Sequence, residues 1–230
     1  MTQWERDAFW DRPEMAERMG NRPPDHRFVA LADRGLDLEP ILDVGCAGGR
    51  NTAFAAERGL KVIAFDVAAT MVAATRARLA PHLGEHLAEE RVRQLDLSSL
   101  GDVWPASEGP FGLILALGVL QDLPDAAAFE RALQDLFDLC KPGGLVLIAN
   151  FGADSQPDGV PLRPLEGSPH VYLGFGHGGR PMTMPDPSTL DAWAQAAGFE
   201  VDVPTDVRTA ETEAGFRTTL NAQYRRPRER

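Results

Sequence analysis

The chain has few cysteines and no long hydrophobic run, and we expect no leader sequence from its first residues. Only Cys46 and Cys140 are present, too few for a disulfide framework, and such usage is typical of a reducing compartment. The most apolar run, residues 112–120, falls far short of the roughly 20 residues that a membrane-spanning helix needs. The N-terminus is charged from its fifth residue and has no apolar core like that of a signal peptide. These absences predict a soluble, cytoplasmic protein.

Positive charge is also scarce. The 23 basic and 34 acidic residues give a net charge of -11, which opposes binding to a phosphate backbone, so we expect no nucleic acid partner. The last seven residues, YRRPRER, hold four arginines; they could form a local basic patch, but we expect a solvated tail after the final strand. Lysine is limited to Lys61 and Lys141 beside abundant arginine and alanine, which suggests a GC-rich bacterial source.

The 230 residues, 43% hydrophobic and 25% charged, fit one well-buried α/β domain. Short apolar runs alternate with helical patterns, and the runs are continuous, as in parallel strands buried on both faces. We expect strands at residues 41–44, 62–65, 92–95, 113–117 and 145–149. We expect helices at residues 52–58, 68–79 and 126–139, the last one stopped by the sequence KPGG. This alternation predicts right-handed crossovers and an open, doubly wound, mostly parallel sheet.

Two regions depart from the alternation. Residues 1–38 are mainly helical in pattern, with a second helix from about Asp25 to Gly35, whereas residues 151–186 are rich in glycine and proline and suggest loops or a hairpin. Residues 188–203 then read as a capped helix and a strand, and residues 215–224 as a closing strand. We therefore divide the single domain, 1–230, into a helical cap (1–38), a core (39–150), a lid (151–186) and a C-terminal helix with strands (187–230).

The most informative stretch is DVGCAGG, residues 43–49, between the first strand and its helix. In an open parallel sheet, ligands bind beyond the carboxyl ends of the strands. Gly45, Gly48 and Gly49 let the backbone approach a ligand closely and take positive φ. Asp66 closes the second strand, 23 residues after Asp43, which places a carboxylate beside the same cleft at a spacing suited to a ribose diol.

Phosphate-binding loops fit this stretch poorly. When the dinucleotide pattern G-x-G-x-x-G/A is laid on Gly45, Ala47 and Arg50 stand where the later glycines belong. A Walker loop would need a Gly-Lys-Ser/Thr ending, which is absent. A ligand with adenosine but no phosphates fits better, and a nicotinamide-dependent oxidoreductase stays as the alternative.

On these residues the sequence resembles the class I S-adenosylmethionine-dependent methyltransferases that act on small molecules. Asp43, Gly45, Ala47 and Gly49 fall on the family's acidic-x-Gly-x-Gly-x-Gly loop, and GRNT, RQLDLSSL, FGLILALGVLQDLPD and LCKPGGLVLIA follow in the family's order. The match covers about residues 38–150, and AGFEV with the closing strand extends it to most of the chain. It implies a Rossmann-like, seven-stranded fold in which the core binds the cofactor. It also implies methyl transfer from S-adenosylmethionine to an unidentified small-molecule acceptor, releasing S-adenosylhomocysteine; a non-catalytic protein that binds this cofactor is a further alternative.

The resemblance also implies a cofactor site. Asp66 would hold both ribose hydroxyls, or else cap the helix that begins near Ala68. Asp96 would receive the adenine amino group, or else be a surface acid, and Leu97 would offer its backbone N–H to the ring. The cofactor contacts implied are Arg27, Asp43, Gly45, Cys46, Ala47, Gly49, Asn51, Asp66, Val67, Met71, Asp96, Leu97, Leu117 and Gly118.

Several of these residues have a second interpretation. Met71 packs near the adenine or simply in the core, and Arg27 either meets the methionine carboxylate or is a charge on a helix surface. Leu117 and Gly118 would meet the methionine part. Because alanine at positive φ costs roughly 1 kcal/mol, we expect a negative φ at Ala47, with its methyl turned from the cofactor and the neighbouring glycines supplying the freedom.

Methyl transfer from a sulfonium releases a neutral leaving group, so holding donor and acceptor in line can do most of the work. The histidines and cysteines show no metal-ligand spacing, so we expect no metal. We expect Cys46 to contribute backbone rather than to act as a nucleophile. The identity of a general base and the oligomeric state, monomer or homodimer, do not follow from the sequence.

Candidates for the acceptor site follow the fourth strand and lie in the lid. Gln121 and Asp122 could contact the acceptor or merely supply polarity at a helix start. His170 and Tyr172, two residues apart, should face the same side of an extended segment, with ordinary loop hydrogen bonding as the alternative. Trp10 in the cap is expected to be a packing anchor.

Overall fold

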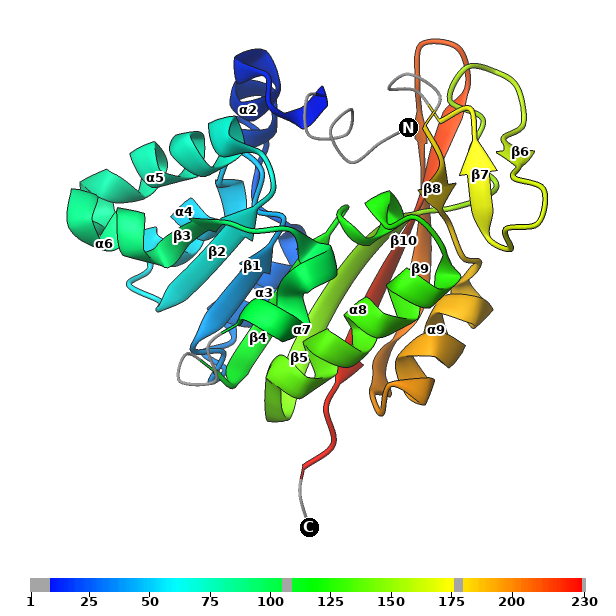
Figure 1. The fold of residues 1–230 in the computed structure, drawn as a ribbon. Helices are drawn as coiled ribbons and strands as arrows, with labels where there is room; N and C mark the ends of the chain where they lie inside the picture. The colour runs from blue at the N-terminus through cyan, green and yellow to red at the C-terminus, as the bar shows by residue number, and fades with distance from the viewer. Residues whose placement is uncertain (1–8, 105–108, 176–179, 229–230) are drawn as a thin grey trace. The chain divides into compact units, whose positions relative to one another are not determined.

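The computed structural model describes residues 9–104, 109–175 and 180–228, and it gives only the backbone of residues 102 and 103. The chain forms two compact units, Met1–Leu115 and Ala116–Arg230, and their boundary lies within strand β4 (Phe111–Leu117). Each unit is traced by its colours in Figure 1.

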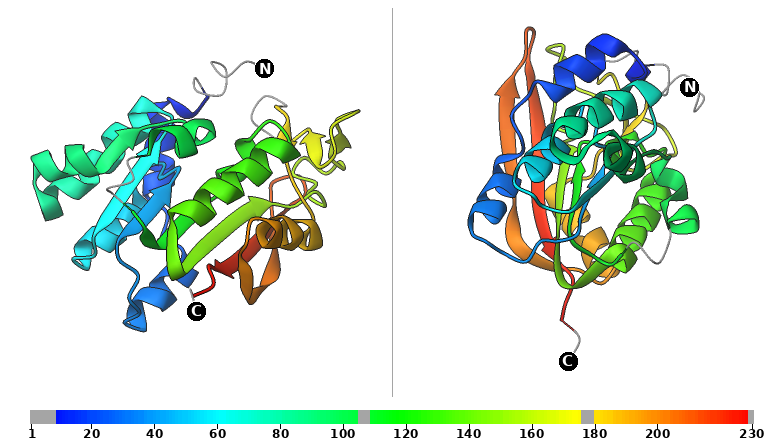
Figure 2. Two further views of the ribbon diagram at one scale, coloured as in Figure 1. Left: turned by 60° about the horizontal axis from the view of Figure 1, so that its bottom comes forward. Right: turned by 90° about the vertical axis from the view of Figure 1, so that its left-hand side faces the viewer.

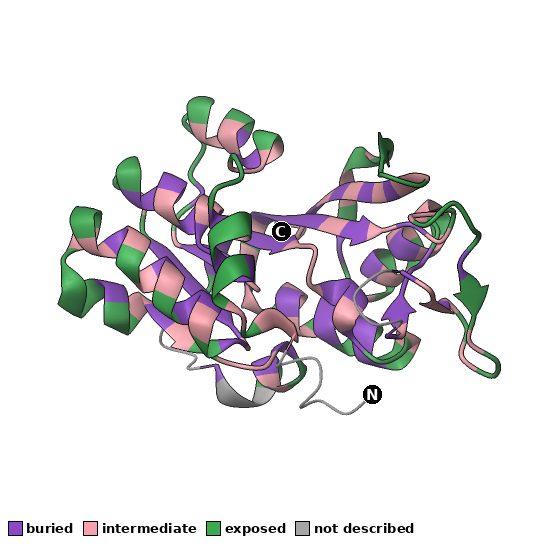
Figure 3. Ribbon diagram, turned by 90° about the horizontal axis from the view of Figure 1, so that it is seen from above, coloured by how far each residue is buried: buried purple, intermediate pink, exposed green. Residues whose placement is uncertain are grey.

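The first unit contains a parallel sheet. Strand β1 (Ile41–Val44) pairs with β2 (Val62–Asp66), which pairs in turn with β3 (Val92–Gln94). All residues of β1 and β2 are buried, as the continuous apolar runs predict (Figure 3). The carboxyl ends of β1 and β2 therefore lie at one edge of this sheet. At this edge the glycine loop follows β1, and Asp66 is the last residue of β2.

Helices surround these strands in the first unit. They are α2 (Pro13–Gly20), α3 (His26–Asp33), α4 (Arg50–Glu57), α5 (Ala69–Leu83), α6 (Glu85–Arg91) and α7 (Leu100–Val103), with the 3-10 turn η1 (Leu97–Ser99). Helices α4 and α5 pack against β2, and α2 packs on α5. The sequence did not predict α6, because this short helix buries only Ala88 and so has no apolar periodicity.

The second unit is built on antiparallel strands. Its elements are the 3-10 turn η3 (Leu120–Asp122), α8 (Ala126–Leu139), β5 (Cys140–Phe151), β6 (Arg163–Pro164), β7 (Val171–Leu173), β8 (Met182–Thr183), α9 (Pro187–Ala196), β9 (Glu200–Glu211) and β10 (Phe216–Arg225). Strand β10 is antiparallel to both β5 and β9, and β6, β7 and β8 form a small sheet of their own. Helix α8 lies along β5 (Figure 2).

The strands of the main sheet hydrogen-bond in the order β3-β2-β1-β4-β5-β10-β9. The predicted fold, a doubly wound, mostly parallel sheet of seven strands, is therefore confirmed. The sequence did not predict that β10 runs antiparallel to its neighbours. The division into cap, core, lid and C-terminal part stays a prediction. In the part of the chain that the structure describes, none of the helices has the length and apolarity needed to cross a membrane.

The C-terminal arginines contradict the prediction of a solvated tail. Arg226 donates from Nη1 to the carbonyl oxygens of Phe137, at 2.9 Å, and Cys140, at 2.8 Å. The last carbonyls of a helix lack intrahelical donors, so Arg226 satisfies the end of α8 from a position distant in the sequence. Arg225 is also held, by Asp202, at 2.7 Å.

The sequence KPGG has a different role from the one predicted. Helix α8 does end at Leu139, but β5 begins directly at Cys140 and runs through these residues. The N–H of Gly143 donates to the carbonyl of Arg226 at 2.8 Å, and Gly143 has a φ of 80°. The segment is therefore the start of a strand, with one left-handed residue in it.

Candidate functional site

The loop between β1 and α4 places its glycines in two different roles. Gly45 and Gly49 have left-handed φ values of 65° and 82°, a conformation that glycine adopts without steric cost. Gly48 is not left-handed; instead a Cβ there would overlap the carbonyl oxygen of Ala16 and lie 2.5 Å from the backbone nitrogen of Gly20. Helix α2 thus crosses directly over the loop, which requires that Gly48 have no side chain.

Ala47 adopts a φ of 49°, so the predicted negative φ is wrong. Its N–H donates to Oδ2 of Asp66 at 2.9 Å, and its carbonyl accepts from Oγ1 of Thr75 at 2.8 Å. A hydrogen bond contributes about 1 kcal/mol, and more to a charged group, so these bonds offset the roughly 1 kcal/mol cost of left-handed alanine. The methyl group packs against the apolar cluster around Met15 and Ala68.

Asp66 joins the glycine loop to the start of α5. Besides accepting from Ala47, its carboxylate accepts through Oδ1 from the N–H of Ala68 at 3.0 Å, and only 8% of the residue is exposed. The N-cap of α5 is Ala68, and no side chain caps this helix. The capping role predicted as an alternative is therefore wrong: Asp66 instead closes a turn just before the helix, and ribose binding by Asp66 stays a prediction.

Asp43 and Cys46 are both buried at the loop. Burial raises the pKa of Asp43 to about 6, against the opposing effect of Thr52, whose Oγ1 donates to Asp43 at 2.6 Å. Burial, together with the charges of Asp66 and Asp43, raises the pKa of the Cys46 thiol well above its usual value. A thiol that stays protonated is a poor nucleophile, which agrees with the predicted backbone role.

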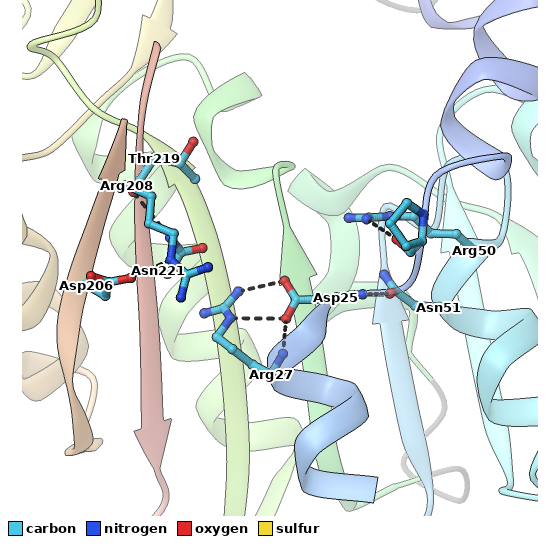
Figure 4. A network of polar contacts seen from close by, with 9 residues as sticks. Asp25, Arg27, Arg50, Asn51, Asp206, Arg208, Thr219 and Asn221 are labelled. Carbon is cyan, nitrogen blue, oxygen red and sulfur yellow. Dashed lines mark hydrogen bonds and ion pairs between the residues drawn. The ribbon is translucent and has the colours of Figure 1, made fainter. Parts of the chain in front are cut away.

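A polar network connects α3 to α4 beyond the loop (Figure 4). The backbone N–H of Asp25 donates to Oδ1 of Asn51 at 2.8 Å, and the Asp25 carboxylate accepts from Nε and Nη2 of Arg27 at 3.2 and 3.1 Å. Burial raises the pKa of Asp25, but the hydrogen bonds and charge of Arg27 outweigh burial and lower it overall. The side chain of Arg27 is only 14% exposed, so its interpretation as a surface charge is wrong.

The predicted adenine contacts lie after β2 and β3. Asp96 precedes η1 and accepts through Oδ1 from the N–H and hydroxyl of Ser98, both at 2.8 Å. Leu97 is the first residue of η1, a position whose N–H has no acceptor within the helical turn. The carbonyl of Val67 accepts from the Gln94 side chain at 2.9 Å.

Met71 lies within the apolar cluster between α2 and α5. It is 1% exposed, and the cluster also contains Met15, Ala16 and Ala68. This burial favours the core interpretation of Met71. Trp10 packs against the same cluster, as the predicted anchor should.

In the second unit, Leu117 ends β4 and Gly118 follows it with a φ of 88°. The N–H of Gly118 donates to the carbonyl of Ala149 at 2.8 Å, and its own carbonyl accepts from Nε2 of Gln121 at 2.7 Å. Gln121 is buried and therefore does more than supply polarity at a helix start. The neighbouring Asp122 pairs with Arg180 at 2.7 Å.

The prediction that His170 and Tyr172 lie on one extended segment is wrong. His170 has a left-handed φ of 61°, at the end of a turn closed by the N–H of Val171 and the carbonyl of Ser168. Its ring meets that of Trp193 edge-on, with centroids 5.2 Å apart. Tyr172 instead lies in β7 and packs against an apolar cluster, Leu162, Phe175, Met182 and Met184.

Comparison with known proteins identifies the family. Residues 15–202 match a family model described as a methyltransferase domain. The chain belongs to this methyltransferase family. It is an S-adenosylmethionine-dependent methyltransferase that acts on a small molecule, as the resemblance of the sequence implied.

Relatives of this methyltransferase include ubiquinone biosynthesis O-methyltransferases from Pseudomonas. The protein from Pseudomonas paraeruginosa is 29% identical over 84% of this chain and 78% of its own length, and that from Pseudomonas entomophila is 26% identical with the same coverage. Among solved structures, the CcbJ methyltransferase of Streptomyces caelestis has a TM-score of 0.64 at 20% identity, covering 95% of this chain and 98% of that one. The N-methyltransferase NodS of Bradyrhizobium japonicum, in complex with S-adenosylhomocysteine, has a TM-score of 0.60 at 16% identity, covering 93% and 97%.

Sequence reasoning missed three residues that hold the loop of this methyltransferase, Asp25, Thr52 and Thr75. Thr75 is buried on the apolar face of α5 between Val72 and Leu79, and a threonine at helical spacing among apolar residues was the available signal. Asp25 stands directly before a helical pattern, which is the signature of an N-cap. Within residues 9–104, 109–175 and 180–228, no group of three or more His, Cys, Asp or Glu side chains could hold a metal ion.

Proposed function

We propose that the first unit grips S-adenosylmethionine between its glycine loop and Asp66. The observation that carries this proposal is the hydrogen bond from the Ala47 N–H to the Asp66 carboxylate, at the carboxyl ends of β1 and β2. It holds the carboxylate beside glycine-rich backbone in the region of a parallel sheet where ligands bind. Asp66 would accept from both ribose hydroxyls.

The other predicted contacts take their roles from their positions. Asp96 would accept from the adenine amino group, and the N–H of Leu97 would meet the ring. Gly45, Cys46 and Gly49 would contribute backbone only. The support for these assignments is the position of the residues: in the first unit, they lie where the chain leaves β1, β2 and β3.

Asp43, Asn51 and Arg27 lie near the start of α4 in the first unit and would serve the methionine part. The contact of Leu117 and Gly118 with the methionine part stays a prediction. Asp25 accepts from Nε and Nη2 of Arg27. Arg27 would meet the methionine carboxylate while it stays paired with Asp25. This pairing fixes the orientation of the guanidinium before the ligand arrives.

We propose that the methyl acceptor is a small molecule with a hydroxyl oxygen. The support is that the Pseudomonas relatives are O-methyltransferases; an amine is the second candidate, because NodS is an N-methyltransferase. In-line displacement needs positioning rather than a covalent nucleophile, in agreement with the inert Cys46 thiol. Gln121, His170 and Tyr172 are candidates for acceptor contacts, and of these only His170 and Tyr172 can exchange a proton.

The acidic net charge of -11 opposes nucleic acid as a partner. We infer that the enzyme works in the cytoplasm, as a monomer or homodimer, without nucleic acid or membrane partners. The N-terminal helices and residues 151–186 would act as cap and lid of the single domain.

Calorimetric titration with S-adenosylhomocysteine tests the cofactor site. Losing a charge-assisted hydrogen bond costs about 1.5 to 3 kcal/mol, so Asp66→Ala should weaken binding about ten- to one-hundred-fold. Asp66→Asn, which keeps the size of the side chain, guards against a folding defect. Asp33→Ala removes an exposed carboxylate from α3 and should bind like wild type. Unchanged affinity in both Asp66 variants would refute the assignment.

A further inference from the structure

Two side-chain oxygens in the second unit lack the hydrogen bonds that buried acceptors normally make. They are Oε1 of Gln121 and Oδ1 of Asn150, in residues that are 2% and 0% exposed. Among the described residues neither oxygen has a hydrogen-bond partner. Because the great majority of buried polar atoms in native proteins are paired, two unpaired acceptors require an explanation.

The orientation of both amides is fixed by the groups around their nitrogens. Nδ2 of Asn150 donates to the carbonyls of Phe151, at 3.0 Å, and Thr183, at 3.2 Å. Nε2 of Gln121 donates to the carbonyl of Gly118 at 2.7 Å. Exchanging oxygen and nitrogen in either amide would set two acceptors against each other. The oxygens therefore point away from the backbone carbonyls and can be satisfied only by a donor.

Hydrogen bonds bring the two residues into the same part of the unit. Gly118, which holds Gln121, donates to Ala149, the residue before Asn150. Thr183, which accepts from Asn150, donates through Oγ1 to the carbonyl of Leu123 at 2.8 Å, directly after η3. Gln121 follows β4 and Asn150 lies near the end of β5, and the region beyond the carboxyl ends of such strands is where α/β enzymes bind their ligands.

We propose that Gln121 Oε1 and Asn150 Oδ1 recognise N–H or O–H donors on the methyl acceptor. They select molecules that carry a hydroxyl or an amine over the same molecules with these donors replaced by methyl groups. The inference rests on the proposed function and deepens it, because it names the chemistry by which the acceptor is chosen. Where the recognised donor is the reacting hydroxyl, methylation removes it, and the product loses this hydrogen bond.

Matched pairs of small molecules test the proposal. The protein is saturated with S-adenosylhomocysteine and titrated by calorimetry with three pairs, in each of which the first molecule carries the donor and the second is its methylated form. The pairs are catechol with veratrole, aniline with N,N-dimethylaniline, and cyclohexanol with methoxycyclohexane. A hydrogen bond to a buried acceptor is worth about a ten-fold preference, so wild type should prefer the donor-bearing member of at least one pair by about that factor. In Gln121→Met and Asn150→Leu the preference should largely disappear. Gln121→Met loses only one internal hydrogen bond, whereas Asn150→Leu loses two. Gln121→Met therefore still decides the test if Asn150→Leu does not fold.

A control variant separates recognition from stability. Tyr224→Phe removes another buried hydrogen bond, from the Tyr224 hydroxyl to Asp191 at 2.8 Å, and should keep the wild-type preference. Equal binding, or no binding, of both members in all pairs would overturn the proposal, as would variants that keep the preference. A matching loss of S-adenosylhomocysteine affinity in both variants would also overturn it, because the oxygens would then serve the cofactor. Failure of wild type to bind S-adenosylhomocysteine at all would refute the proposed function itself.

Discussion

Replacing Asp43 with asparagine should make the protein more stable at neutral pH, although Asp43 is one of the proposed cofactor contacts. Burial raises the pKa of this carboxyl from 3.8 to about 6. The difference is about 2 pH units at about 1.4 kcal/mol each, so keeping Asp43 ionised in the folded protein costs up to about 3 kcal/mol at pH 7. Asparagine can accept the same hydrogen bond from Thr52 without a charge.

The sign of the pH dependence follows from the direction of the shift. Below pH 3.8 the carboxyl is protonated in both the folded and unfolded chains, so it adds no pH-dependent cost. Between pH 3.8 and about 6 the folded chain binds more protons than the unfolded chain, so this group lowers stability as the pH rises. Above pH 6 the cost is complete and constant. The advantage of Asp43→Asn should therefore grow from about pH 4 to about pH 6 and then stay level.

Urea unfolding of both proteins at a series of pH values measures this difference, because the titration of all other groups largely cancels. We expect the free energy of unfolding of Asp43→Asn, minus that of wild type, to increase by about 2 to 3 kcal/mol between pH 4 and pH 7. The variant should bind S-adenosylhomocysteine more weakly, as expected where stability and function compete. A difference that does not change with pH, or one that shrinks as the pH rises, would refute the reasoning.

Three further substitutions test the loop and the end of α8. Gly48→Ala should lower the melting temperature and displace α2, because its Cβ would overlap the carbonyl of Ala16; an unchanged melting curve would contradict this close contact. Cys46→Ala should keep methyl transfer within about two-fold, measured as release of S-adenosylhomocysteine, since a thiol that stays protonated contributes no chemistry; complete loss of activity with intact folding would point to a nucleophile. Arg226→Ala should cost about 1 to 2 kcal/mol in urea unfolding because it removes the hydrogen bonds to the carbonyls of Phe137 and Cys140, whereas Arg208→Ala, on the exposed pair with Asp206 shown in Figure 4, should cost less than 1 kcal/mol.

The sequence predicted those features that local rules determine. Strand β1 has the predicted bounds, Ile41–Val44, because a continuous apolar run is sufficient to identify a strand buried on both faces. Helix α8 also has its predicted bounds, since Asp125 caps it by accepting from the N–H of Ala128. Both signals lie within a few residues of the element that they define.

The wrong predictions depend on contacts between distant residues. Arg226 lies far along the chain from the helix end that it satisfies, so the sequence around it resembles any basic tail. The left-handed Ala47 is held by Asp66 and Thr75, and no pattern within the loop records those partners. The turn that ends at His170 is similarly tied to Met184, whose N–H donates to the His170 carbonyl at 2.7 Å.

Departures from local rules gather at the positions proposed to contact ligands. The glycine loop contains an alanine at positive φ and a buried carboxyl with a raised pKa. In the second unit Gln121 Oε1, after β4, and Asn150 Oδ1, near the end of β5, have no hydrogen-bond partner among the described residues. The buried carboxyl and the two unpaired oxygens are each unfavourable for folding, and a cationic group or a hydrogen-bond donor on a ligand would relieve them directly. In a protein selected for folding alone, such costs would be removed by single substitutions, and their retention beside strand ends is what a binding site requires.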